Sequence, residues 1–230
     1  MTDPPGTAFR YSDINFILLG QLVEKASGMP LEQFAQQRIF GPLGMIHTVY
    51  RPLTHIGRAG IAPTQFAGAE AAPESLHGDM QPGQTLQGEV HDPTARRMDG
   101  VAGSAGVFST LGDLARYARM LLGGGELDGV RVLAPDSVRL LTTAQSPAGV
   151  KAVRALGMDI DSPYSKPRGA VYPVGSFGHT GFTGCILWVD PRSRSFYVFL
   201  SNRVYPDDKA SIVPLYAELG TLSAQAALAP

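Results

Sequence analysis

Three short segments of the 230-residue sequence contain residue types that can do chemistry. Residues Tyr11–Asp13 place a phenol directly before an expected helix and a carboxylate two positions later. Residues 177–184 (FGHTGFTG) place a histidine among three glycines, which let a backbone approach a ligand that the polar groups can bind. The third segment, His91-Asp92, precedes a glycine-rich stretch. Each also has a structural interpretation, as a packed tyrosine, a tight turn or a solvated loop histidine.

Helices and turns must position these segments. Helical spacing of apolar residues predicts helices over 14–26, 31–40, 110–122, 135–143 and 212–228. Ser12 or Asp13 is placed to cap the first helix, and Gly28 to end it. Asp128-Gly129 predicts a tight hairpin turn between the third and fourth helices.

The last third of the chain predicts a sheet. Strands are expected over 150–160, 170–174, 184–189 and 196–201. The last two are continuous apolar runs joined by DPRSRS, which indicates an antiparallel hairpin covered on both faces. The expected fold class is therefore α/β of the α+β type. A helical region over 1–145 is followed by an antiparallel sheet with flanking helices over 146–230, packed as one compact unit.

A long stretch without periodicity interrupts the helical region. Residues 50–98 are rich in Gly, Pro, Ala and Gln, and contain His55 and His77. A loop of this length within a compact domain is usually functional or mobile. Both histidines are interpreted as solvated loop residues.

Composition excludes several classes of protein. The formal net charge is -1, without a Lys/Arg run, which argues against nucleic acid as a partner. No apolar run is long enough to span a bilayer, and the N-terminus lacks the apolar region of a secretory signal. The lone Cys185 excludes an internal disulfide and leaves the compartment undetermined. We expect no cofactor and no metal site.

Three longer segments carry a family resemblance: residues 9–45, 88–125 and 177–206, together about half of the chain. In this order, they resemble the serine β-lactamase and penicillin-binding-protein superfamily, most closely the class C β-lactamases and the related family VIII carboxylesterases. The resemblance implies a partial β-lactamase/transpeptidase-like fold. It also implies a serine hydrolase that forms an acyl-enzyme on a small ester or amide substrate.

The resemblance assigns roles to single residues. Tyr11 matches the tyrosine of the family's Tyr-x-Asn element, a general base or acid, and Asp13 stands where that element has Asn. His179, Thr180 and Gly181 match its Lys-Thr-Gly element at the edge of the sheet, with His in place of Lys. His179 is therefore a catalytic candidate together with Tyr11 and Asp13, whereas Thr180 and Gly181 are expected to bind substrate. Losing a permanent cation at residue 179 is expected to favour neutral esters over carboxylate-bearing β-lactams.

The third segment, His91 and Asp92, is also expected to bind substrate. It lies at the start of the second resembling stretch, directly before the glycine-rich residues.

The nucleophile of the family is missing. Its Ser-x-x-Lys element would place a lysine one helical turn after the serine, and no serine of this sequence has a lysine three positions later. Ser165 and Lys166 are adjacent and do not meet that spacing. Ser104 lies in a Gly-x-Ser-x-Gly variant, AGSAG, but with loop rather than strand before it, and Ser109 is a weaker candidate still.

Three hypotheses therefore stay open. The chain is a truncated serine hydrolase without its nucleophile, a non-catalytic binding or assembly module that retains the cleft, or one part of a site completed by another chain. An uncovered sheet edge would favour self-association or pairing with a complementing N-terminal segment.

Overall fold

The computed structural model describes residues 3–68, 80–207 and 211–229. Its α-helices are α1 Asp13–Ser27, α2 Leu31–Ala35, α3 Pro93–Arg97, α4 Leu111–Leu122, α5 Pro135–Thr142 and α6 Val213–Leu228. Its strands are β1 Val49–Tyr50, β2 Gln65–Phe66, β3 Thr85–Leu86, β4 Val107–Phe108, β5 Glu126–Leu127, β6 Val130–Arg131, β7 Val153–Arg154, β8 Asp159–Asp161, β9 Phe177–Thr180, β10 Ile186–Asp190 and β11 Ser195–Phe199. A π-helical turn covers Gln36–Phe40, and 3-10 turns cover Pro52–Thr54, Arg58–Gly60 and Lys166–Arg168.

The chain forms two compact units. Unit 1 comprises Met1–Tyr11, Leu114–Leu200 and Ser211–Pro230, and unit 2 comprises Ser12–Asp113 and Ser201–Ala210. Tyr11 and the 177–184 segment therefore belong to unit 1, whereas Asp13 and His91-Asp92 belong to unit 2. The expected division at residue 145 stays a prediction.

Unit 1 contains a five-stranded antiparallel sheet with the order β11-β10-β9-β8-β7. β10 and β11 form a hairpin whose last pair is Asp190 with Ser195. The Asp190 carboxylate closes the turn by accepting backbone hydrogen bonds from Arg192 and Ser193, each 3.1 Å long. The hairpin predicted from the two apolar runs is confirmed, as is the combination of helices with an antiparallel sheet.

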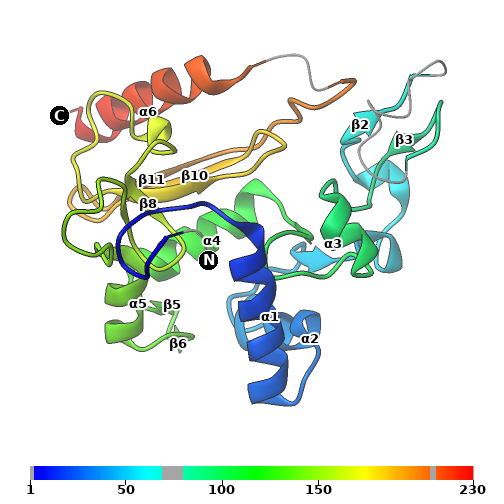
Figure 1. Cartoon of the computed structure of the whole chain (residues 1–230), viewed down its shortest axis with the longest axis horizontal. Coiled ribbons are helices and arrows are strands. Elements are labelled where there is room, and N and C mark those ends of the chain that lie inside the picture. The colour runs from blue at the N-terminus through cyan, green and yellow to red at the C-terminus, as the bar shows by residue number, and fades with distance from the viewer. Residues whose placement is uncertain (1–2, 69–79, 208–210, 230) are drawn as a thin grey trace. The chain divides into compact units, whose positions relative to one another are not determined.

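Helices cover both faces of this sheet: α6 lies along one face, and the part of α4 that belongs to unit 1 lies on the other (Figure 1). The core beneath α6 contains Trp188 and Tyr216, which are 0% and 6% exposed. α6 packs closely on the Lys166–Arg168 turn at Gly220. A Cβ at this position would lie 2.0 Å from the carbonyl oxygen of Pro167, so only glycine fits there. The absence of a side chain at residue 220 thus sets how closely α6 packs.

Two strand predictions in unit 1 are wrong. Residues 150–160 form a hairpin, β7 and β8, rather than one strand, because Gly157 takes a positive φ of 89° and the Ala155 N–H bonds back to the Met158 carbonyl at 2.9 Å. Residues 170–174 form no named strand. Tyr172 instead packs on Tyr197 of β11, with ring centroids 6.4 Å apart.

The short connections in the middle of the chain agree with the predictions. β5 and β6 pair around Asp128 and Gly129, whose φ values of 51° and 79° suit a tight hairpin turn. At the start of α4, the Thr110 hydroxyl accepts a hydrogen bond from the Asp113 N–H at 3.3 Å. The α4 and α5 helices are confirmed within a residue or two of their expected ends.

Unit 2 contains α1, α2 and α3. Helix α1 ends at Gly28 in the left-handed conformation, as predicted, but Ser12 occupies the N-cap position without a side-chain hydrogen bond. The expected helix over 31–40 changes from α-helix to π-helix after Ala35.

The long stretch over 50–98 is more ordered than expected. It contains the β2–β3 pair and the helix α3 besides its two 3-10 turns. His55 lies in it and is exposed. His77 lies outside the described residues.

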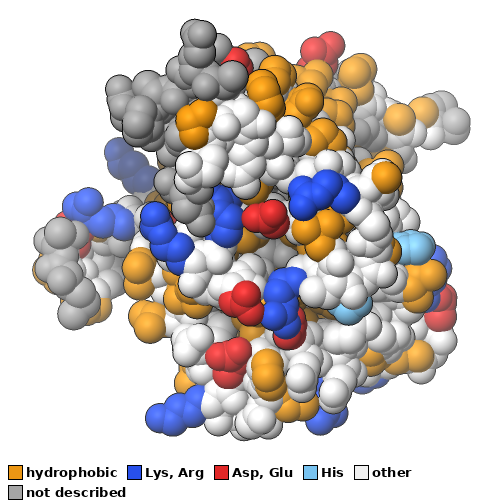
Figure 2. All heavy atoms as spheres, turned by 90° about the vertical axis from the view of Figure 1, so that its right-hand side faces the viewer, with side chains coloured by type: hydrophobic (Ala, Val, Ile, Leu, Met, Phe, Trp, Pro, Cys, Tyr) orange, Lys and Arg blue, Asp and Glu red, His pale blue; other side chains and the backbone are white. Residues whose placement is uncertain are grey.

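The described surface is mixed in character. On the face drawn in Figure 2, acidic and basic side chains alternate with apolar ones. Among the described helices, none is both long and apolar enough to cross a membrane.

Candidate functional site

Tyr11 and His179 lie together in unit 1, although 168 positions separate them in the sequence (179 − 11). Their ring centroids are 6.2 Å apart, with an angle of 38° between the ring planes. Tyr164 also contacts Tyr11, with its ring centroid 5.2 Å from that of Tyr11. Tyr11 is 45% exposed and the His179 side chain is 32% exposed, so a ligand in solvent can reach both. The two side chains therefore lie close together, as the resemblance implies, while their role in one functional site stays a prediction.

A buried arginine supports this aromatic group. The guanidinium of Arg154 lies over the rings of Phe9 and Tyr11, with its central carbon 5.2 and 5.8 Å from their centroids. These are cation–π distances, and Arg154 is only 9% exposed, so the attraction is weakly screened by water. Arg154 thus fixes the segment that carries Tyr11 against β7.

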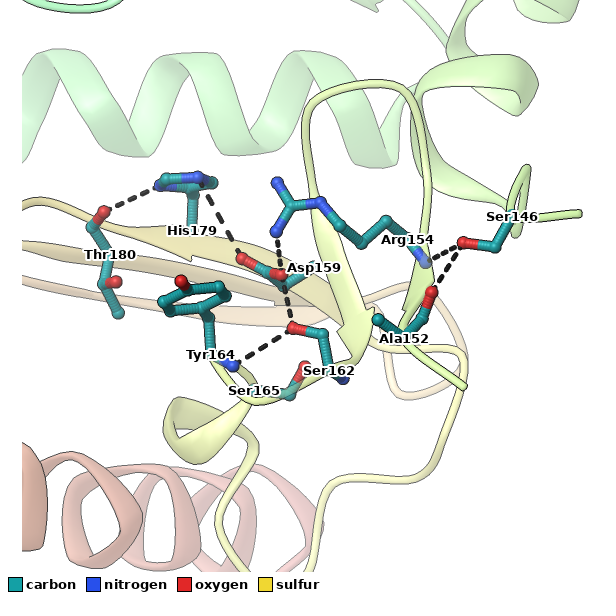
Figure 3. Close-up of polar contacts among 9 residues, drawn as sticks. All are labelled: Ser146, Ala152, Arg154, Asp159, Ser162, Tyr164, Ser165, His179 and Thr180. Carbon is teal, nitrogen blue, oxygen red and sulfur yellow. Dashed lines mark hydrogen bonds and ion pairs between the residues drawn. The ribbon is translucent and has the colours of Figure 1, made fainter. Parts of the chain in front are cut away.

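The charge of Arg154 is balanced by Asp159, which is fully buried on β8. One carboxylate oxygen, Oδ1, accepts hydrogen bonds from the Arg154 guanidinium and from the Ser162 hydroxyl, the latter at 2.5 Å. The other oxygen, Oδ2, is buried without a hydrogen-bond partner and lies 4.0 Å from Nε2 of His179. Figure 3 shows the carboxylate between the guanidinium of Arg154 and the ring of His179. We call Phe9, Tyr11, Arg154, Asp159, Tyr164 and His179 the His179 cluster.

The backbone of β9 holds the imidazole of His179 from the opposite side. Its Nδ1 lies 2.7 Å from the carbonyl oxygen of Thr180. Gly178 lets β9 pack against β10, because a Cβ there would lie 2.2 Å from the carbonyl oxygen of Leu187. Gly181 is exposed, and its N–H bonds to the carbonyl of Cys185 at 2.8 Å. Thr180 and Gly181 thus continue directly from the His179 cluster, while their role in substrate binding stays a prediction.

The expectation that this segment lies at the edge of the sheet is wrong, since β8 and β7 continue the sheet beyond β9. Only Gly178 of β9 pairs with β8, opposite Asp159. Because the strands are antiparallel, His179 and Thr180 extend past the start of β8. They are open for that reason rather than through an edge position.

An open groove of about 580 Å³ adjoins the cluster in unit 1. Phe9, which belongs to the His179 cluster and contacts Arg154, lines this groove. Ser162, whose hydroxyl donates to Asp159, lines it as well. Its other lining residues are Thr7, Ala8, Gly149, Val150, Lys151, Ala152, Asp161 and Pro163. No group of three His, Cys, Asp or Glu side chains among the described residues could hold a metal ion.

Three predicted site residues belong to unit 2 and have identifiable structural positions. Asp13 is exposed in the first turn of α1, where a carboxylate suits the positive end of the helix dipole. Asp92 caps α3 by accepting the Ala95 N–H at 2.6 Å. His91 is 9% exposed and bonds through Nε2 to Gln65 at 3.0 Å. Their roles in catalysis and substrate binding stay predictions.

Neither serine alternative has the geometry of an activated nucleophile. The Ser104 hydroxyl is buried and has no hydrogen-bond partner among the described residues, and no strand leads directly into its segment. Ser109 bonds to the hydroxyl of Thr48 at 2.8 Å. An activated serine needs a base within hydrogen-bonding distance.

Sequence reasoning missed Arg154 and Asp159, which join the two sides of the cluster. The sequence did contain an indication of this pair, because two opposite charges lie five residues apart in a stretch that otherwise predicts a strand. Arg and Asp are almost never fully buried unless paired. Phe9 and Tyr164 gave no signal, because their contacts depend on the chain path.

Comparisons with known proteins agree with this fold. The Beta-lactamase family model matches residues 1–221. The chain is 34% identical over 211 residues to a "Putative D-alanyl-D-alanine carboxypeptidase" of Escherichia coli (strain K12), covering 86% of this chain and 46% of that protein. It is 35% identical over 205 residues to an N-acetylmuramyl-L-alanine amidase of Bacillus subtilis (strain 168), covering 86% and 45%. The chain thus spans about half the length of the curated relatives that it matches.

A solved structure shows the same fold. A β-lactamase from Mycobacterium bovis superposes with a TM-score of 0.63 at 22% identity, over 98% of this chain and 66% of that chain. The sheet with helices on both faces therefore corresponds to part of the β-lactamase/transpeptidase fold. This chain belongs to the β-lactamase family, within the superfamily of serine β-lactamases and penicillin-binding proteins.

Proposed function

We propose that this chain forms one side of the acyl-transfer site of a β-lactamase-family hydrolase, with Tyr11 and His179 as its chemical groups. The observation that carries the proposal is their approach to 6.2 Å between ring centroids while both stay accessible to solvent. The buried Arg154–Asp159 pair behind them supports a site whose shape is set before a ligand binds.

The chemistry divides between a proton carrier and a hydrogen-bond donor. In the proposed reaction, a serine oxygen forms a bond to the substrate carbonyl carbon, and the bond from that carbon to the leaving group breaks. Tyr11 takes the proton from the serine and gives it to the leaving group. In the second step, a water oxygen bonds to the acyl carbon, the bond to the serine oxygen breaks, and Tyr11 passes the proton from the water to the serine. His179 and the backbone at Thr180 bind a polar group of the substrate.

The serine and its lysine lie outside these 230 residues in this proposal, because the sequence contains no Ser-x-x-Lys pair. They belong either to a longer product of the gene or to a second chain. The substrate is a small amide or ester. The carboxypeptidase and amidase names of the curated relatives support an amide, whereas His179 in place of a lysine favours a neutral ester.

Two measurements test the proposal. First, the 15N-labelled chain is titrated with the dipeptide D-alanyl-D-alanine, and the resonances of residues 178–181 are expected to shift. Second, the longest product of the gene that contains these residues is assayed for release of D-alanine and for p-nitrophenyl butyrate hydrolysis. Tyr11→Phe is expected to lower kcat by roughly 100-fold, the lower range for general acid–base catalysis.

Tyr205→Phe serves as a matched control, since it removes the phenol hydroxyl of a tyrosine in unit 2 that is 44% exposed, close to the 45% of Tyr11. If the full gene product retains its rate when Tyr11 or His179 is replaced, the proposed roles are wrong. If the dipeptide binds at 178–181 and no product of the gene hydrolyses either substrate, the chain is a binding module instead.

A further inference from the structure

The open groove of unit 1 begins beside the His179 cluster. Three short segments line it, residues 7–9, 149–152 and 161–163, and Phe9 belongs to both the groove and the cluster. Its volume of about 580 Å³ lies within the range of about 300–1,000 Å³ that is usual for ligand sites. The proposed reaction at Tyr11 and His179 does not use this groove. It is therefore available for a part of the substrate that lies away from the reacting bond.

A row of aromatic rings connects the proposed reacting groups with the groove. The ring centroid of Tyr11 is 6.2 Å from that of His179 and 5.2 Å from that of Tyr164. The ring centroid of Tyr164 is in turn 6.5 Å from that of Phe9. Tyr11 and Tyr164 are 45% and 42% exposed, so a ligand can lie against both rings. The three steps together are no longer than about five residues of an extended chain.

The turn after β8 connects this row to the groove. The Ser162 hydroxyl donates a hydrogen bond to Asp159 at 2.5 Å and accepts one from the backbone N–H of Tyr164 at 3.1 Å (Figure 3). Phe9 is held by the guanidinium of Arg154, whose central carbon is 5.2 Å from the ring centroid. Because these contacts exist without a ligand, binding does not have to order this wall of the groove, and that lowers the entropic cost of binding.

The charges in the groove favour an anionic group on the ligand. Lys151 lines the groove, is exposed, and has no hydrogen bond or ion pair with any residue that the structure describes. Asp161 also lines the groove, but its carboxylate is paired with Arg168 at 2.9 Å. Among the described lining residues, the ammonium group of Lys151 is therefore the charge with which a ligand can pair.

We propose that this groove binds the acyl side of an extended peptide substrate, and that Lys151 is a specificity-determining residue that pairs with an acidic side chain of that peptide. The acidic side chain lies up to about five residues before the reacting bond, as the length of the aromatic row requires. This inference rests on the proposed function and narrows its substrate from a small amide to a short acidic peptide.

Binding to the chain tests this inference without turnover. The probe is the peptide acetyl-Glu-Ala-Ala-Ala-D-alanyl-D-alanine, and its counterpart has Gln in place of Glu. On titration of the 15N-labelled chain with the Glu peptide, the resonances of residues 149–152 and 161–163 are expected to shift together with those of 178–181. At low ionic strength, the Glu peptide is expected to bind roughly two- to fivefold more tightly than the Gln peptide, a ratio typical of an exposed ion pair.

Variants of two exposed lysines separate a specific contact from a general effect of charge. Lys151→Ala is expected to remove the preference for the Glu peptide, and Lys151→Glu to replace it with a preference for a peptide that has Lys in place of Glu. Lys166→Ala is the matched control, because it removes an exposed lysine of unit 1 that does not line the groove. This variant should keep the preference of the unaltered chain.

Equal binding of the Glu and Gln peptides by the unaltered chain would overturn the proposal, as would a preference that persists in Lys151→Ala. Shifts at 178–181 without shifts at 149–152 and 161–163 would also overturn it, while leaving the proposed hydrolase function intact. Groove shifts and a peptide preference that depend on Lys151 would support the proposal even if no product of the gene hydrolysed a substrate. In that case the hydrolase function alone would be wrong.

Discussion

Replacing Asp159 by alanine is expected to destabilise unit 1 far more than the same change at Asp161. The two carboxylates lie two residues apart on β8, and each pairs with an arginine. They differ in burial: the side chains of Asp159 and Arg154 are 1% and 10% exposed, whereas those of Asp161 and Arg168 are 49% and 21% exposed. The comparison therefore isolates the effect of burial on an otherwise similar ion pair.

The expected magnitudes follow from this difference. Removing one partner of a buried pair leaves an uncompensated charge and costs about 3–5 kcal/mol, whereas a largely exposed pair contributes about 1 kcal/mol or less. In a chain of this size, each kcal/mol lowers Tm by about 2–4 °C. We expect Asp159→Ala to lower Tm by about 6–20 °C, and Asp161→Ala by about 4 °C at most.

Thermal and urea unfolding followed by circular dichroism measure both changes. The double variant Asp159→Leu with Arg154→Met should recover most of the loss, because an apolar pair of similar volume avoids the cost of burying two charges. Equal effects of the two single alanine variants would refute the argument from burial. A double variant less stable than Asp159→Ala would show that the cation–π contacts of Arg154 dominate.

Four further outcomes are expected. The 230-residue chain alone should not hydrolyse p-nitrophenyl butyrate; a robust rate that Ser104→Ala abolishes would mean that this serine was wrongly discounted. Gly220→Ala should lower Tm, because the added Cβ would meet the Pro167 carbonyl. Gly112→Ala in α4, where the space around the Cβ is open, should raise the free energy of unfolding by up to about 1 kcal/mol, and a change of stability in the same direction for both variants would contradict the packing argument. Burial raises the pKa of Tyr50 to about 12, so stability should be fully present below about pH 10 and fall as the pH rises to about 12, more shallowly in Tyr50→Phe; identical pH profiles would exclude this contribution. Static light scattering should give a mass above the 24.4 kDa of one chain, because β11 is an outer strand of the described sheet; a monomer at every concentration tested would contradict self-association.

Elements that depend on neighbouring residues alone could be predicted from the sequence. The hairpin at Asp128-Gly129 and the β10–β11 pair follow from turn residues and continuous apolar runs, which act over a few residues. The proximity of Tyr11 and His179 could be predicted only through the family resemblance. Nothing in the residues around either one indicates that the other lies beside it.

The errors have physical causes. Gly157 signalled a turn within residues 150–160, but the apolar run around it outweighed that signal. Residues 170–174 have the composition of a strand, yet Tyr172 is used to pack the core beneath α6 rather than to extend the sheet. The Asp159–Arg154 pair depends on the β7–β8 hairpin, so it could not be placed before that turn was known.

The division of the chain into two interleaved units has a consequence for biosynthesis. The chain passes between the units after residues 11, 113, 200 and 210, so neither unit is a continuous segment. A ribosome produces Tyr11 about 170 residues before His179. Contacts so distant in sequence form slowly, because a long loop must close before they contribute stability. We therefore expect the His179 cluster to be absent from a nascent chain until the strands up to β11 have emerged.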